Sequence, residues 1–243
     1  MVIPAALNSV PLTYKIVAIL AATAFFLPLL LVLLRRMGSY RPFVWLTAYW
    51  AVSGIVNLIL VGEKIAGSNV TVVIERVYNL AGAPLMLLIL YKSVQIEKIQ
   101  NSIKKVLPAF LCAVLAVTLI TRLQYYAEVL MVGAGLVIVL IYILWVIAHY
   151  LKGIKLHNED QALQFIYYAL LFEYGISVIT FVFNYIIPHH RDIADSFLIY
   201  HLSIIVSTLI ASYGLISYRP QSTKQKAGQK KRLMEREAEI RFL

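Results

Sequence analysis

Long apolar runs alternate with short polar segments along this chain of 243 residues. Each run is close to the length of about 20 residues that an α-helix needs to cross about 30 Å of hydrocarbon. There are seven of them, over residues 16–34, 43–62, 71–91, 106–121, 129–151, 163–187 and 196–218. Lipid offers the backbone no hydrogen-bond partner, and the short alternating runs of a barrel are missing. The pattern therefore predicts an all-α, polytopic membrane protein with seven transmembrane helices.

The composition agrees with this interpretation. Hydrophobic residues make up 61% of the chain, charged residues 14%, and the mean hydropathy is +0.80. Soluble domains are typically about half apolar and about a quarter charged, so a soluble class is excluded. We expect one transmembrane domain over residues 1–218 and a basic tail with a short amphipathic helix over residues 219–243. The single cysteine, Cys112, excludes a disulfide framework and a cysteine-based metal site, and its thiol is expected to be packed.

The charges predict an orientation. Most of the 22 Lys and Arg residues lie in segments 35–41, 92–105, 152–155 and the tail. Each of these segments follows an odd-numbered span, so all four lie on the same side of the membrane. Cytoplasmic segments carry such an excess, so the N-terminus is predicted outside and the C-terminus in the cytoplasm of a cell (inner) membrane. The net charge of +10 then reflects topology, and no nucleic-acid partner is expected.

Local features predict how the helices are built. Pro28 should kink the first helix, and Gly133-Ala134-Gly135 should mark a tight contact between helices, as should the small residues of 81–83. The polar segment 92–105 is expected to be an inner loop with a short interfacial helix. The fourth span would then have only 16 residues, or about 24 Å.

Polar side chains within the apolar runs are the candidates for function. The run 71–91 carries Glu75, Arg76 and Asn79, although a charge deep in a bilayer costs about 2.5 to 3.5 kcal/mol. Arg76 lies close enough to the outer end to extend its guanidinium toward the interface. The second span carries Tyr49, Ser53 and Asn57 on one helical face, at spacings of four.

The sixth span carries the most informative stripe. Glu173, Ser177, Thr180 and Asn184 follow one another at i, i+4, i+7 and i+11, which is one face of a helix. Glu173 lies about ten residues, or about 15 Å, from the inner end and so near the bilayer midplane. Such a stripe should not face lipid.

Short matches between the two halves predict a 3+1+3 plan of two parallel repeats joined by the fourth span. The segment 77–80 resembles 199–202, and 43–45 resembles 165–167. The plan places the polar stripes around one cavity that opens to the outside and is floored near Glu173. The residues predicted to line it are Asn57, Glu75, Tyr78, Asn79, Glu173, Ser177, Asn184, Tyr200 and His201. The alternative is a set of interhelical hydrogen bonds, each worth about 0.6 to 2 kcal/mol, that hold the bundle together without a ligand.

No cofactor or metal is expected. Adjacent His189 and His190 rarely bind one metal together, and a solvated loop over 188–195 explains them more simply. The chain has no HExxH motif, paired aspartates or Ser-Lys dyad at usable spacing, so an enzyme is not expected. The seventh span lacks the lysine that a retinal Schiff base requires.

Two resemblances bear on function. The segment Val77-Tyr78-Asn79-Leu80 and the seventh span, FLIYHLSIIVSTLIASYGLIS, resemble seven-helix membrane proteins of unassigned function in Bacteroidetes. The tail end, LMEREAEIRFL, is similar to the linker helix that precedes the phosphoacceptor helix of bacterial sensor histidine kinases.

These features predict a sensor or receptor that relays a change to a cytoplasmic signalling protein through its C-terminal helix. The other partners are the bilayer and, for the basic tail, anionic lipid headgroups. Two alternatives remain: a small SWEET-like 3+1+3 transporter, in which Glu173 beside His201 carries a proton, and a structural subunit of a membrane complex. A homo-oligomer is compatible with each.

Overall fold

The computed structural model describes residues 12–66, 70–121, 125–152, 158–186 and 193–218, and these ranges contain helices and short connections without a strand. The helices are α1 (Leu12–Ala24), α2 (Leu27–Leu34), a 3-10 turn η2 (Met37–Ser39), α3 (Arg41–Ala66), α4 (Val70–Ser93), α5 (Glu97–Thr121), α6 (Tyr125–Lys152), α7 (Asn158–Phe181), a π-helical turn η3 (Val182–Ile186) and α8 (Ile193–Ser217). The predicted all-α class is confirmed for these ranges. The tail 219–243 and His189 and His190 lie outside them.

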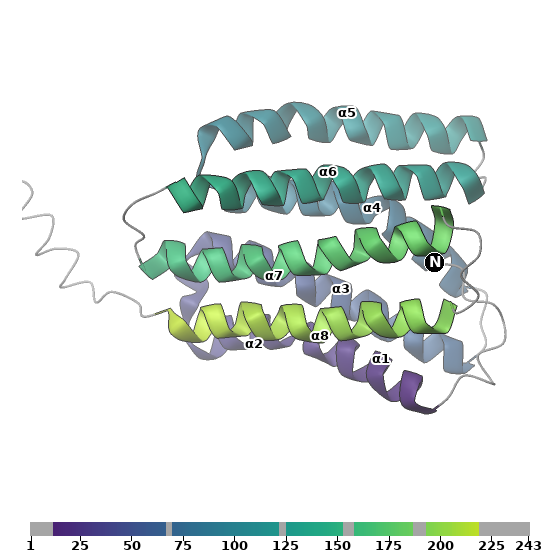
Figure 1. The fold of residues 1–243 in the computed structure, drawn as a ribbon, viewed down its shortest axis with the longest axis horizontal. Helices are drawn as coiled ribbons and strands as arrows, with labels where there is room; N and C mark the ends of the chain where they lie inside the picture. The colour runs from purple at the N-terminus through teal and green to yellow at the C-terminus, as the bar shows by residue number, and fades with distance from the viewer. Residues whose placement is uncertain (1–11, 67–69, 122–124, 153–157, 187–192, 219–243) are drawn as a thin grey trace, which may run out of the picture.

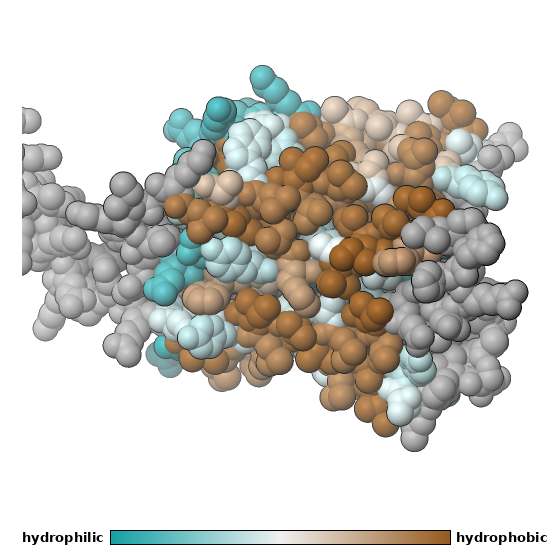
Figure 2. Space-filling view, in the orientation of Figure 1, coloured by the Kyte–Doolittle hydropathy of each residue, from teal (hydrophilic) through white to brown (hydrophobic). Residues whose placement is uncertain are grey.

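Within the described ranges, seven segments are long and apolar enough to cross a membrane. They are Thr13–Leu34, Arg41–Leu60, Ile74–Ser93, Glu97–Thr121, Tyr126–Leu151, Gln161–Ile186 and Leu198–Ser217. Figure 2 shows apolar side chains over the middle of the bundle and polar ones toward one end. Leu119 and Ile120 leave 78% and 81% of their surface exposed, as expected for side chains that lipid covers. The seven predicted spans of a multi-pass membrane protein are thus confirmed.

The helices form two layers. In Figure 1, α5, α6, α7 and α8 lie side by side in that order, with α4, α3 and the α1–α2 pair behind them. Contacts agree with this view: α7 packs on α6 and α8, α4 packs on α3, α5 and α6, and α1 and α2 pack on α3 and α8. Following these contacts around the bundle, the helices succeed one another in the order α1, α3, α4, α6, α7 and α8, and α8 packs back on α1.

Helix α5 differs from the prediction. It is one helix from Glu97 onward, and only residues 94–96 separate it from α4, so the expected inner loop with its own short helix is wrong. Ile99 and Ile103 are fully buried, four residues apart, whereas Lys104 is exposed. Because the first turns of α5 bury one apolar face against the bundle, they continue the helix instead of ending it.

The same helix corrects a second expectation. Cys112 is exposed on α5 and not packed in the core. Because α5 lies at the edge of the bundle and packs mainly on α4 and α6, much of its surface faces outward.

The first span is broken, as Pro28 predicts. Helix α1 ends at Ala24 and α2 begins at Leu27, with Pro28 in its first turn, where the missing N–H costs no helical hydrogen bond. Gly54 of α3 lies against this break: a Cβ there would be 2.9 Å from atoms of Phe25 and Phe26. The glycine lets α3 approach the broken helix closely.

The predicted contacts of small residues are confirmed for Gly133, Gly135 and Ala83, but not for Ala81, which is exposed, or Gly82, where a Cβ would meet nothing within 4 Å. A Cβ on Gly135 of α6 would lie 2.6 Å from the Cβ of Ala83 on α4. A Cβ on Gly133 would lie 2.5 Å from the ring of Phe181 on α7. Both helices can therefore approach α6 only because these positions lack a side chain.

The end of α8 is held by the first span. Arg35 Nη1 donates hydrogen bonds to the carbonyl oxygens of Leu215 and Ile216, each at 2.6 Å. A cation at this position also compensates the partial negative charge of a helix C-terminus. Tyr218, the last described residue, packs edge-on against Phe43, with ring centroids 5.2 Å apart. The C-terminal end of α8 is thereby tied to α2 and α3.

Candidate functional site

A buried carboxyl group lies at the centre of the bundle. Glu173 of α7 leaves only 6% of its surface exposed. Its Oε2 accepts hydrogen bonds from Trp50 Nε1 of α3 at 2.7 Å and from Ser207 Oγ of α8 at 3.1 Å. Trp50 and Ser207 are themselves completely buried. One carboxylate oxygen thus joins three helices.

The two oxygens of Glu173 are not equivalent. Both donors bind Oε2, and within the described part of the chain Oε1 accepts no hydrogen bond. Hydrogen bonds to a charged acceptor contribute about 1.5 to 3 kcal/mol each and partly offset the cost of a carboxyl group inside a membrane. Oε1 receives no such compensation from the described residues.

Four tyrosines surround this carboxyl. The hydroxyls of Tyr49 on α3 and Tyr174 on α7 are 2.7 Å apart, and both side chains are buried. Tyr78 of α4 donates to Ser53 Oγ of α3 at 2.7 Å. Tyr200 of α8 lies near Tyr78 and Glu173. We call the set Tyr49, Trp50, Ser53, Tyr78, Glu173, Tyr174, Tyr200 and Ser207 the Glu173 cluster.

Three of the residues predicted to line a cavity belong to this cluster: Tyr78, Glu173 and Tyr200. Tyr78 of the third span and Tyr200 of the seventh both lie near Glu173, while their facing one another across a cavity stays a prediction. His201 is buried at 5% exposure, and its ring centroid lies 5.5 Å from that of Tyr200. Asn79 is half-buried on α4.

Other predicted residues bind their own helices. Asn57 Nδ2 donates to the carbonyl oxygen of Ser53 at 2.8 Å, and Ser177 Oγ donates to that of Glu173 at 2.8 Å. Asn184 lies in the π-helical turn that extends α7. All three are half-buried, and none of the sixth-span stripe is exposed. The stripe thus faces the bundle, while the cavity itself remains a prediction.

The charges of α4 lie at a different place. Arg76 Nε is 3.7 Å from Glu128 Oε2 of α6, so the guanidinium has a partner that the sequence analysis did not identify. The side chains of Arg76 and Glu128 are 37% and 11% exposed, so solvent partly screens the attraction between their charges. Glu75 is half-buried on the same helix, beyond Tyr78 toward the predicted outer end.

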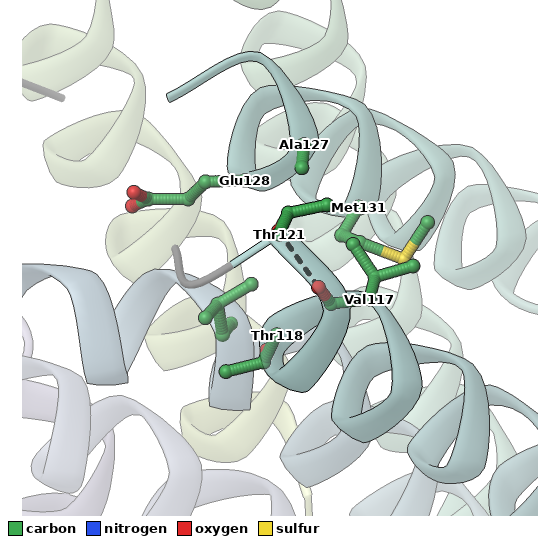
Figure 3. A pocket seen from close by; sticks show the side chains of 7 residues that line it. Val117, Thr118, Thr121, Ala127, Glu128 and Met131 are labelled. Atoms are coloured by element: carbon green, nitrogen blue, oxygen red, sulfur yellow. Dashed lines mark hydrogen bonds between the residues drawn. The ribbon is translucent and has the colours of Figure 1, made fainter. Parts of the chain in front are cut away.

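A small, open hollow lies beside this ion pair, between α4, α5 and α6. Its lining is mostly apolar: Leu80, Val117, Thr118, Thr121, Ala127, Glu128 and Met131. Figure 3 shows that the Glu128 carboxylate extends away from Thr121 and Met131, while Thr121 Oγ bonds the Val117 carbonyl oxygen of its own helix at 2.7 Å. This hollow contains no residue of the Glu173 cluster.

Sequence reasoning missed Trp50 and Ser207 as partners of the buried carboxyl, and Tyr174 as a member of the Glu173 cluster. Trp50 and Tyr174 resemble ordinary apolar positions, and a membrane serine usually bonds its own helix, as Ser207 also does to the Ile204 carbonyl oxygen at 3.0 Å. The available signal was Glu173 itself. A carboxyl at that depth requires donors, and Trp50 and Ser207 lie at matching depth on the neighbouring spans.

Comparisons with known proteins add no assignment: no protein-family model, curated protein or solved structure matches this chain. Among the described residues, no group of three or more His, Cys, Asp or Glu side chains is arranged to hold a metal ion. The Glu173 cluster therefore has to be interpreted from its own chemistry.

Proposed function

We propose that this protein is an outward-facing membrane receptor, which binds a small ligand above Glu173 and relays the change through α8 to a cytoplasmic partner. The observation that carries the proposal is the carboxyl of Glu173, bound on one oxygen by α3 and α8 and left unpaired on the other among the described residues. A ligand at the unpaired oxygen would act on three helices at once.

The distribution of burial along α7 supports an outer opening. Before Glu173, the side chains of Leu163, Ile166 and Leu170 are completely buried in the apolar core. After Glu173, Ser177 and Asn184 are polar and half-buried. The proposed orientation has the N-terminus outside and the C-terminus in the cytoplasm of the inner membrane, and it makes the polar half of the helix the outer one. Ligand would then enter from outside and stop at the apolar core.

The connection of α8 supports the relay. This helix carries Tyr200 and Ser207 in the cluster and ends at the contacts of Arg35 with Leu215 and Ile216. A ligand that draws Glu173 away from Ser207 shifts the balance between two packings of α8, provided that it binds one packing better. The tail that follows would pass this shift to a signalling protein, and its basic residues would contact anionic headgroups.

Labelling of introduced cysteines tests the site and its side of entry. In a Cys112→Ala background, Ser177→Cys is expected to react with a membrane-impermeant maleimide added from the N-terminal side. Ile179→Cys is the matched control. Ile179 lies on the same helix, leaves 50% of its surface exposed and would face lipid. Equal labelling of the two variants, or labelling of Ser177→Cys only from the C-terminal side, would contradict the proposal.

Mutation of the carboxyl tests the relay. Glu173→Gln should alter every output that depends on a cytoplasmic partner, whereas Glu128→Gln should not, because Glu128 belongs to the separate ion pair with Arg76. The receptor hypothesis would be abandoned if Glu173→Gln left all such outputs unchanged.

The packing order favours a second candidate, the 3+1+3 transporter. If the α1–α2 pair, α3 and α4 form one repeat, then α6, α7 and α8 form the other. In this division the α1–α2 pair corresponds to α6, α3 to α7 and α4 to α8. The contact of α1 with α8 then corresponds to the contact of α6 with α4, and α3 contacts its own counterpart α7. A two-fold axis along the membrane normal requires paired contacts of this kind. Labelling of Ser177→Cys from both sides, together with Glu173-dependent uptake in proteoliposomes, would favour the transporter over the receptor.

A further inference from the structure

The Glu173 cluster also constrains the chemistry of a ligand. Its one ionisable acid is Glu173, and the described partners of that carboxyl, Trp50 and Ser207, are neutral. None of the Lys and Arg side chains in the described ranges forms an ion pair with it; Arg76 pairs with Glu128 instead. When Glu173 is ionised, a positive charge at Oε1 would compensate it.

An ionised Glu173 repels anionic ligands, and a neutral polar ligand meets hydroxyls several of which already take part in hydrogen bonds. The hydroxyls of Tyr49 and Tyr174 bond each other, and that of Tyr78 is committed to Ser53. One hydroxyl of the Tyr49–Tyr174 pair donates to the other, and Tyr78 donates to Ser53, so a sugar or an amide that engaged these groups would have to compete with existing hydrogen bonds.

Divalent metal ions fit the cluster poorly as well. Calcium takes about six to eight oxygen ligands and magnesium about six in a strict geometry. The described residues offer no group of three His, Cys, Asp or Glu side chains. One free carboxylate oxygen does not replace the hydration shell of such an ion.

The aromatic groups favour an organic cation. The aromatic residues near the carboxyl come from the four helices α3, α4, α7 and α8: Tyr49, Trp50, Tyr78, Tyr174 and Tyr200. An ammonium group near the face of Trp or Tyr gains about 0.5 to 2 kcal/mol, and more when it is desolvated. Recognition of amines by aromatic side chains uses this interaction, with a carboxylate to accept the N–H donors.

We propose that the Glu173 cluster binds a small organic ammonium ion, with its N–H groups on Glu173 Oε1 and its alkyl part against the aromatic rings. This inference rests on the proposed function, since the ligand needs access from the outside. Glu173 is 94% covered in this structure, as its exposed fraction of 6% implies, so the ligand must be small and its entry must move Tyr200 or Ser207. Tyr200 is half-buried and provides the side chain to be displaced from the outer side.

Fluorescence of Trp50 provides a direct test. The chain has three tryptophans, so Trp45→Phe together with Trp145→Phe leaves Trp50 as the reporter beside Glu173. The full chain in lipid nanodiscs is titrated with ethylammonium chloride, with sodium chloride at equal ionic strength, and with ethanol as the neutral analogue of the alkyl part. Ethylammonium is expected to change the fluorescence saturably, whereas sodium and ethanol are not.

Variants then assign the signal to the carboxyl. Glu173→Gln is expected to weaken the response about tenfold or more, because it removes the charge that the N–H groups bind. Glu128→Gln is the control and should respond as the parent does. Ser207→Ala keeps the carboxylate and removes one hydrogen bond from Oε2, so this variant should bind ethylammonium at least as well as the parent. It tests the carboxylate independently in case the Glu173→Gln variant fails to fold.

The failures of the two proposals are distinguishable. A response to sodium equal to that of ethylammonium, or a response that survives Glu173→Gln, overturns the ammonium assignment. An absent response in a protein whose Ser177→Cys variant is labelled from outside overturns the ligand class and leaves the receptor proposal standing. An absent response without labelling refutes both.

Discussion

Replacement of Trp50 by phenylalanine tests whether the hydrogen bonds of Glu173 hold the bundle together. Trp50→Phe removes the indole N–H that lies 2.7 Å from Glu173 Oε2 but retains an aromatic ring in the same fully buried place. Loss of a hydrogen bond to a charged group costs about 1.5 to 3 kcal/mol. The smaller ring adds a cavity term of about 1 kcal/mol. We expect a loss of about 2.5 to 4 kcal/mol in the free energy of unfolding.

Reversible unfolding in mixed micelles, followed by circular dichroism, measures this loss. Trp45→Phe is the matched control: Trp45 lies on the same helix, leaves 42% of its surface exposed, and should change stability by less than about 0.5 kcal/mol. A cycle with Glu173→Met then separates the hydrogen bond from the change of ring. The double variant should be less destabilised than the sum of the single ones by about 1 to 3 kcal/mol.

Two results would refute the reasoning. The first is a Trp50→Phe variant no less stable than Trp45→Phe, which would mean that the buried N–H contributes nothing. The second is additivity in the cycle with Glu173→Met, which would mean that the two side chains act independently although their atoms are 2.7 Å apart.

Three further predictions concern the helix contacts. Gly135→Val should lower the free energy of unfolding by about 1 to 3 kcal/mol because a Cβ there meets α4 at 2.6 Å, whereas Gly82→Ala, where a Cβ meets nothing within 4 Å, should be tolerated. Arg35→Gln should cost about 1 kcal/mol and increase hydrogen exchange in the last turn of α8, because it removes the charge bound to two carbonyl oxygens; unchanged exchange there would contradict the contact. Ile103→Ser should lower the free energy of unfolding by about 2 to 4 kcal/mol, because Ile103 is fully buried. Lys104→Ser is the control and should change it by less than about 0.5 kcal/mol, because Lys104 is exposed. Equal effects in the same unfolding assay would mean that the first turns of α5 do not pack as a helix.

The start of α5 shows how a local pattern can be present and still be misjudged. The segment 92–105 is basic and follows an apolar run, and by composition alone it resembles an inner loop. Its isoleucines at 99 and 103 carry the helical period, but two residues are a weak signal without knowledge of the surface they cover. The structure provides that surface, together with the bond of 2.7 Å between the hydroxyls of Ser102 and Tyr142.

The candidate site shows the same limit more strongly. The spacing of polar residues in the sixth span is enough to single out Glu173 and to predict that its face avoids lipid. Spacing within one helix says nothing about which donors on other helices reach that carboxyl. Trp50 lies more than 100 residues away in the chain, in an apolar segment. Ser207 lies about 30 residues away, in a serine-rich one.

The seven helices follow from the amino-acid pattern alone, because in lipid each helix satisfies its own backbone and is recognised by its own length and apolarity. The break at Pro28 and the close approach at Gly135 are local in the same sense. The hydrogen bonding of Glu173 is not local. It depends on the rotation and depth of α3, α7 and α8 relative to one another, and small residues, aromatic rings and polar contacts spread over the whole bundle set that arrangement. Only the packed bundle therefore shows that one oxygen of Glu173 is bound by two helices and the other is left without a donor among the described residues.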